Sequence, residues 1–235
     1  IKVERGAFSQ EPFSQIAKDA VLFLHITSHV QGVPHAKLFT EKGGTAFPRF
    51  LILAPQGRVL VVGKGARTVE GFRSWIERGR KVQKIFAKSD PTIEEQLLML
   101  ETRLSVSDLA YDEATSARKR LGNMNEAQEK RYQELLMRAD ARSLLNHTRR
   151  ITSAQRIVVG GRLLAHLEAG RIPAAFSEKM VFFDAILDAL ASAKNLEKYR
   201  SVLEQYNASF RRYPNVMKKV AKHRKRFEEM SSSSK

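Results

Sequence analysis

Two kinds of apolar pattern divide this chain, and they limit its fold more than any other feature. Apolar runs of strand length occur only in the first third, at 20–26, 49–53 and 58–62. Beyond Lys88, apolar residues recur at helical spacing, which predicts helices at 92–104, 109–121, 126–148, 154–169, 177–193, 196–211 and 214–230. Because the predicted connections are short, consecutive helices should be antiparallel neighbours.

The strand-like runs of the first third differ in kind. The run at 20–26 is continuously apolar, which predicts a strand buried on both faces. The runs at 49–53 and 58–62 flank Ala54-Pro55-Gln56-Gly57, and this turn chemistry predicts a β-hairpin. Gly63 and Gly65 then break the second run, which indicates a bulge or a close approach of two backbones.

Several short signals predict where helices begin and end. Thr68 is expected to cap a helix that buries Phe72 and Trp75. Asp90, followed by Pro91, is expected to cap the next helix. The stretch 125–128 resembles a capping box, and Gly122 and Gly170 lie where helix ends favour a left-handed residue.

The chain is strongly basic, with 41 Lys and Arg against 25 Asp and Glu and a formal net charge of +16. Such a charge attracts polyanions, although a solvated surface that aids solubility is the simpler explanation. The densest basic stretch, 211–226, contains no acid. Its candidate anion-binding residues are Arg211, Arg212, Lys218, Lys219, Lys222, Arg224, Lys225 and Arg226.

The sequence contains no clear motif for catalysis, metal binding or phosphate binding. The sequence has no cysteine, so this chain offers no thiol nucleophile, disulfide or thiolate metal site. His25, His29 and His35 lie close together in sequence, but their spacing does not make them converge, and ordinary loop and strand-end histidines explain them. We therefore predict no catalytic residue, no metal site and no cofactor. No apolar run is long enough to span a membrane.

The first 87 residues resemble the latter part of a thioredoxin-like domain. The resemblance rests on the order of the apolar run at 21–26, the pair Phe47-Pro48, the hairpin, the break at Gly63 and the helix with Trp75. It implies an N-terminally incomplete α/β thioredoxin-like domain over 1–87. It also implies a cis peptide bond before Pro48 and a substrate groove formed by Phe47 and Pro48.

The resemblance leaves two functions open. The strand and the Cys-x-x-C motif that begin a thioredoxin-like domain have no counterpart here. One expectation is that redox cysteines lie just upstream of Ile1 in a longer parent protein, which would then be a thiol–disulfide oxidoreductase. The other is a cysteine-free interaction scaffold, and a basic nucleic-acid-binding protein is a third hypothesis.

Residues 88–235 resemble the helical, tetratricopeptide-like extensions that follow some bacterial thioredoxin-like domains. Stacked helix pairs bury a continuous core and leave a surface for partners, and a helical cap that only completes a core is an equally good interpretation. The resemblance implies an all-α domain of helical hairpins over 88–235 and a protein or peptide as partner, with polyanion contact as a further expectation. It leaves a cytoplasmic and an extracytoplasmic bacterial location equally open.

Overall fold

The structure, a computed structural model, describes residues 9, 11–23, 35, 37–42, 48–106, 109–146 and 151–232. The chain forms two compact units. The first unit comprises Ile1–Leu109 and Lys119–Gln128, and the second comprises Ala110–Arg118 and Glu129–Lys235. The first unit therefore includes residues beyond 88, where the sequence becomes uniformly helical.

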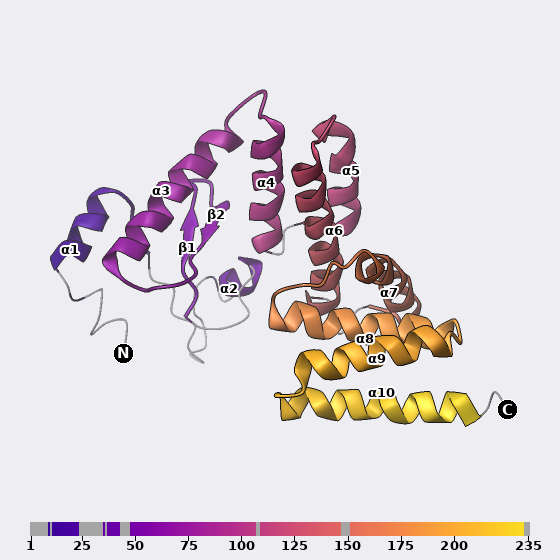
Figure 1. The fold of residues 1–235 in the computed structure, drawn as a ribbon. Coiled ribbons are helices and arrows are strands. Elements are labelled where there is room, and N and C mark those ends of the chain that lie inside the picture. Colours follow the sequence, from indigo (N-terminus) through magenta and orange to yellow (C-terminus); the bar gives the residue numbers. More distant parts are fainter. Residues whose placement is uncertain are drawn as a thin grey trace. The chain divides into compact units, whose positions relative to one another are not determined.

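The first unit combines short helices, one hairpin and two longer helices (Figure 1). Its elements are α1 (Glu11–Ser14), a 3-10 turn η2 (Gln15–Lys18), α2 (Leu38–Glu41), β1 (Leu51–Leu53), β2 (Val59–Val62), α3 (Val69–Phe86) and α4 (Ile93–Ser105). The strands pair antiparallel, with Leu51 opposite Val62. Gly57 closes the turn in the left-handed region, at φ 76°. The predicted hairpin is confirmed.

The predicted thioredoxin-like α/β domain is wrong. Helices dominate the described residues, and the sheet found among them has only two antiparallel strands. Val21, Leu22 and Phe23 open the expected central strand, yet they belong to no strand and are 96%, 51% and 70% exposed; residues 24–30 lie outside the described residues. An apolar run has strand length whether or not other strands pair with it, and pairing is a property of the tertiary fold.

The core of the first unit lies between the hairpin and α3. The Phe72 ring centroid is 5.2 Å from that of Phe50 and 4.8 Å from that of Trp75. Gly63 follows β2, and a Cβ at that position would lie 2.7 Å from the Trp75 ring. Space at Gly63 is therefore tight, but the close neighbour is the packed Trp75 indole rather than the second backbone that was predicted.

Capping explains where the helices begin. The Thr68 side chain accepts a hydrogen bond from the backbone of Gly71, as predicted. The predicted cap at Asp90 is wrong, because Thr92 and Glu95 form a reciprocal capping box. That box satisfies two backbone donors at once, so α4 begins after Thr92 rather than after Asp90. The predicted box at 125–128 is confirmed by two hydrogen bonds between Asn125 and Gln128.

The second unit is built from helices. They are α7 (Ser153–Glu168), α8 (Phe176–Ser192), α9 (Leu196–Phe210) and α10 (Pro214–Ser232), together with most of α5 (Tyr111–Leu121) and α6 (Glu126–Asn146). The helices from α4 to α10 begin and end within about two residues of the predicted ranges, as expected for frayed ends. Gly122 and Gly170 adopt positive φ of 60° and 71° at helix ends, which confirms those two predictions.

Helix α8 lies at the centre of the second unit. It packs against α7 and α9, and α10 packs against α9 and α8 (Figure 1). Because α8 is apolar on nearly every side, it is buried all round; its fully buried residues include Phe182, Phe183, Ala185, Ile186 and Leu187. Gly160 on α7 allows the closest approach, because a Cβ there would lie 2.1 Å from the Ala185 carbonyl oxygen.

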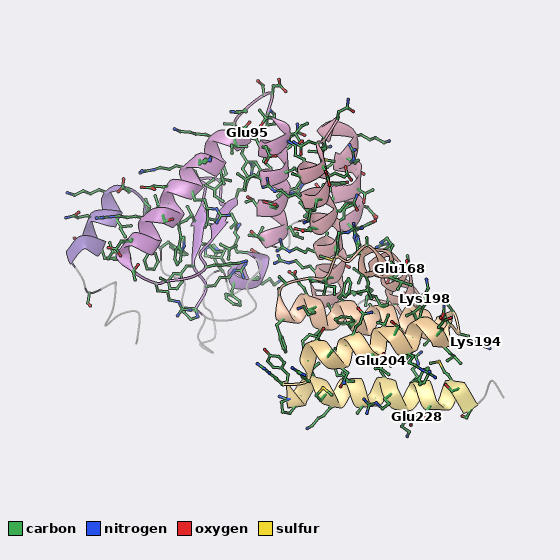
Figure 2. All side chains as sticks on the ribbon, in the orientation of Figure 1. Glu95, Glu168, Lys194, Lys198, Glu204 and Glu228 are labelled. Carbon is green, nitrogen blue, oxygen red and sulfur yellow. The ribbon has the colours of Figure 1, made fainter. Side chains whose placement is uncertain are left out.

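Salt bridges also connect the helices of this unit at its surface. The Lys198 ammonium of α9 donates to the Glu168 carboxylate of α7 at 2.5 Å, and the two residues lie side by side in Figure 2. Both side chains are about half exposed, so this pair adds little to stability. Within the described part of the chain, no helix has the length and apolar character needed to cross a bilayer.

Candidate functional site: a basic face on α10

Helix α10 has one apolar side and several basic sides. Val216 and Val220 are buried against the core, and Phe227 stacks on Tyr199 with ring centroids 5.8 Å apart. These residues recur at helical spacing, so the charged residues between them lie on the remaining surface of the helix. Most of the predicted basic stretch is therefore held in one orientation by the packing of α10.

Asp184 on α8 lies beneath this helix and is only 5% exposed. Its Oδ2 accepts from the Lys219 ammonium at 3.0 Å, and its Oδ1 accepts from the Tyr206 hydroxyl at 2.9 Å. The His223 Nε2 lies 3.2 Å from the same Oδ1. Burial by itself would raise the pKa of Asp184, but the hydrogen bonds from His223 and Lys219 outweigh burial and hold the pKa below its usual value.

The second nitrogen of His223 is also engaged. Its Nδ1 lies 3.1 Å from the Tyr199 hydroxyl, which is also 3.1 Å from the His223 carbonyl oxygen. Burial raises the pKa of Tyr199 to about 12, and burial with the nearby Asp184 carboxylate raises that of Tyr206 as well. Both phenols therefore stay protonated near neutral pH. The hydrogen bonds of this network hold α10 against α8 and α9. The two hydroxyls are therefore buried structural groups rather than accessible nucleophiles.

A second acid on α8 holds two more cations. Asp188 accepts from the Arg156 Nε of α7 at 2.5 Å and from the Arg226 guanidinium of α10 at 2.8 Å. Asp184 and Asp188 are one turn apart, so they lie on the same side of α8 and face the same flank of α10. Together they determine the rotation of α10 about its axis.

These ion pairs separate the eight predicted anion-binding residues into those that have an acidic partner in the described part of the chain and those that have none. Lys219 and Arg226 are bound to the acids of α8, and Lys225 lies 3.9 Å from Glu229. Within the described chain no ion pair forms at the other five, which are exposed: Arg211, Arg212, Lys218, Lys222 and Arg224. We use the name basic face for Lys218, Lys222 and Lys225, which are spaced i, i+4 and i+7 and share one stripe of α10.

An open groove of about 730 Å³ runs beside the basic face. It is lined by Arg156, Asp184, Asp188, Lys219, Lys222, His223, Lys225, Arg226 and Glu229. Cations outnumber acids along it, and Lys222 is the cation in its lining that has no acidic partner among the described residues. The groove can therefore attract a negative group at Lys222 and Lys225, although its acids oppose a uniformly negative ligand.

The other predicted site residues are not brought together. Phe47 lies outside the described residues, and with it the peptide bond before Pro48; Pro48 itself is exposed at a bend. The substrate groove of these two residues therefore stays a prediction. His25 and His29 also lie outside the described residues, while His35 is exposed at φ 61°. The described residues contain no group of side chains suited to hold a metal ion.

The residues that sequence reasoning missed are the acids and phenols under α10. A signal for two of them exists, because Asp184 and Asp188 interrupt the otherwise apolar stretch 180–191 at i, i+4 spacing. Carboxylates are seldom buried unless they are paired, so acids in a helix of this kind indicate cations on a neighbouring element. Sequence alone does not say which of the 41 cations they bind.

Comparison with known proteins gives no further information about the function of this site. No protein-family model matches the sequence, and no curated protein or solved structure matches it significantly.

Proposed function

We propose that this protein is a non-catalytic interaction scaffold whose second unit binds an acidic protein partner on the basic face of α10. The observation that supports the proposal is a stripe of three exposed lysines on a helix whose orientation is fixed by ion pairs to the buried Asp184 and the partly buried Asp188. The stripe covers about 10 Å of helix axis, from Lys218 to Lys225. Because the helix is already held in place, a partner need not order the backbone that carries the lysines when it binds.

Carboxylates beside the basic face favour a protein over a nucleic acid. Glu229 lies 3.9 Å from Lys225. Glu228, which precedes Glu229 in the sequence, lies near the C-terminal end of α10 (Figure 2). A nucleic-acid backbone presents negative charge at every step, so it would meet these acids as well as the lysines. A protein partner can place acids against the lysines and other groups against Glu228 and Glu229.

A thiol–disulfide oxidoreductase is not part of this proposal. That function followed from a thioredoxin-like α/β domain, and the described residues have a helical fold with a two-stranded sheet instead.

The test compares two triple charge reversals in the full chain. The first, Lys218→Glu with Lys222→Glu and Lys225→Glu, inverts the basic face. The matched control, Arg78→Glu with Lys81→Glu and Lys84→Glu, changes the charge equally on exposed positions of α3. Binding of a dye-labelled polyglutamate peptide and of double-stranded DNA is measured by fluorescence anisotropy at several salt concentrations.

The basic-face variant should weaken peptide binding about tenfold or more at low salt, and the α3 control should have a much smaller effect. Peptide should also bind more tightly than DNA of equal charge. Equal losses in the two variants would show that only net charge matters and would overturn the proposal. Tighter binding of DNA, lost in the basic-face variant, would assign the face to a nucleic acid instead.

A further inference from the structure

Two aromatic side chains of the second unit are exposed at one place, where α8 begins and α9 connects to α10. Phe176 is 46% exposed and Tyr213 is 49% exposed. Their ring centroids lie 4.8 Å apart at an interplanar angle of 64°. Both rings also contact Phe210, which is 1% exposed, at centroid distances of 5.2 and 6.1 Å. We call Phe176 and Tyr213 the aromatic corner.

Cations adjoin the aromatic corner. Arg211 and Arg212 lie in the chain between Phe210 and Tyr213, both are exposed, and neither forms an ion pair with any residue in the described ranges. Burial of an exposed aromatic ring is one of the larger favourable terms at a protein interface, and Arg beside an aromatic is a common composition at binding hot spots. The corner therefore offers apolar contact and positive charge within a few residues.

The geometry of the rings indicates what kind of group fits. A nucleic-acid base stacks on a flat ring face. Here the two rings meet edge to face and form an angle rather than a platform. A branched aliphatic or aromatic side chain can contact both rings of such an angle at once. Two unpaired arginines beside that contact favour carboxylates in the flanking positions.

We propose that the aromatic corner holds the apolar anchor of an acidic peptide segment, with Arg211 and Arg212 binding the acids that flank the anchor. This inference rests on the proposed function, because it names the partner of the same unit as an acidic segment with one large apolar residue. It adds a site at the N-terminal end of α10, beyond the lysine stripe.

The test uses two dye-labelled peptides that differ at one position. Both are rich in glutamate, and the central residue is phenylalanine in one and serine in the other. Their affinities for the full chain are compared by fluorescence anisotropy, together with that of a single-stranded RNA oligonucleotide. The variants are Tyr213→Ala and the pair Arg211→Gln with Arg212→Gln. Val158→Ser is the control, because Val158 is an exposed apolar residue on α7 of the same unit.

The phenylalanine peptide should bind about fivefold or more tightly than the serine peptide, which corresponds to about 1 kcal/mol. Tyr213→Ala should remove this preference, the arginine pair should weaken both peptides, and Val158→Ser should change neither. The arginine variant keeps both rings, so it tests the site even where Tyr213→Ala loosens the helix connection.

The outcomes separate this inference from the proposed function. Equal affinities for the two peptides, both weakened by reversal of the lysine stripe, would overturn the corner and leave the basic face intact. Absence of binding to either peptide would overturn both. A larger loss for RNA than for the phenylalanine peptide in Tyr213→Ala would assign the corner to a nucleic acid and overturn the inference.

Discussion

The two units stabilise their interiors in different ways. Among the described residues of the first unit, only one buried residue is polar, namely Thr102. The core of this unit consists of packed aromatic and aliphatic side chains. The second unit buries Asp140, Glu178 and Asp184. Because a buried carboxylate is costly unless it is paired, each of these acids must take cations from a neighbouring element.

The pairs of the second unit show how much basic charge is structural. Glu178 accepts from Arg142 at 2.6 Å and from Arg138 at 3.3 Å. Arg162 donates two hydrogen bonds to Asp140, at 2.9 and 2.5 Å. These arginines contribute to the high number of cations in the sequence, yet they neutralise buried acids inside the unit. The comparison teaches that net charge does not locate a binding surface, whereas the distribution of unpaired cations does.

The largest expected effect concerns the backbone contact in the second unit. Gly160→Ala would place a Cβ 2.1 Å from the Ala185 carbonyl oxygen, and neither helix can give way cheaply. We expect a loss of about 4 kcal/mol or more in the free energy of unfolding. Gly161→Ala is the control, because a Cβ there meets nothing within 4 Å and alanine favours the helix.

Two spectroscopic probes distinguish unfolding of the first unit from unfolding of the second. The chain has one tryptophan, Trp75, which lies in the first unit, so its fluorescence reports on that unit, whereas far-ultraviolet circular dichroism reports on all helices. The Gly160 variant should shift the dichroism transition and leave the fluorescence transition in place. Coincident shifts of both transitions would show that the units do not unfold independently.

A smaller loss is expected when the buried acid under α10 is removed. Asp184→Ala leaves Lys219, His223 and Tyr206 without their shared acceptor, which should cost about 3 kcal/mol. Urea unfolding followed by circular dichroism measures it. Asp188→Ala, at a more exposed acid, should cost about 1 kcal/mol. Equal costs at the two positions would contradict the role of burial.

An effect smaller than that of Asp184→Ala is a dependence of stability on pH that belongs to the second unit. Burial, with a smaller effect of Arg171, lowers the pKa of His166 from 6.5 to about 4. An unfolded chain binds this proton near pH 6.5 and the folded chain does not until about pH 4, so acid favours unfolding in that window. The effect should be on the order of 2 kcal/mol at pH 5.

His166→Gln tests this directly. Glutamine removes the titration and keeps an acceptor for the Arg171 Nε, which lies 3.0 Å from the His166 Nδ1. Stability of the variant, measured by urea unfolding between pH 4 and 7, should vary less with pH than that of the native chain. Parallel pH profiles for the two proteins would rule out His166 as the source.

Local signals in the sequence predicted much of the secondary structure. Thr68 caps α3, Gly170 ends α7, and the helices from α4 onward lie where apolar periodicity places them. The error at Asp90 is also local, because two side chains that cap each other outweigh one. The α/β prediction failed for a different reason, since strand pairing joins residues that no short pattern connects.

Less of the candidate site could be predicted. The basic stretch itself was found, and all eight of its cations are in the described chain. Their division into structural and unpaired groups was not found, because it depends on Asp184 and Asp188, which are 35 and 38 residues away from Lys219 and Arg226. The aromatic corner was missed as well, since Phe176 and Tyr213 meet only after α8, α9 and α10 have packed.

The sequence by itself determined the positions of the helices from α3 onward, the hairpin turn and the excess of positive charge. Each of these depends on composition or on residues a few positions apart, because helix hydrogen bonds and caps span three or four residues. Only the tertiary structure decided which cations neutralise buried acids and which face solvent. That choice depends on distances between helices, where burial makes an unpaired charge costly and a paired one stable.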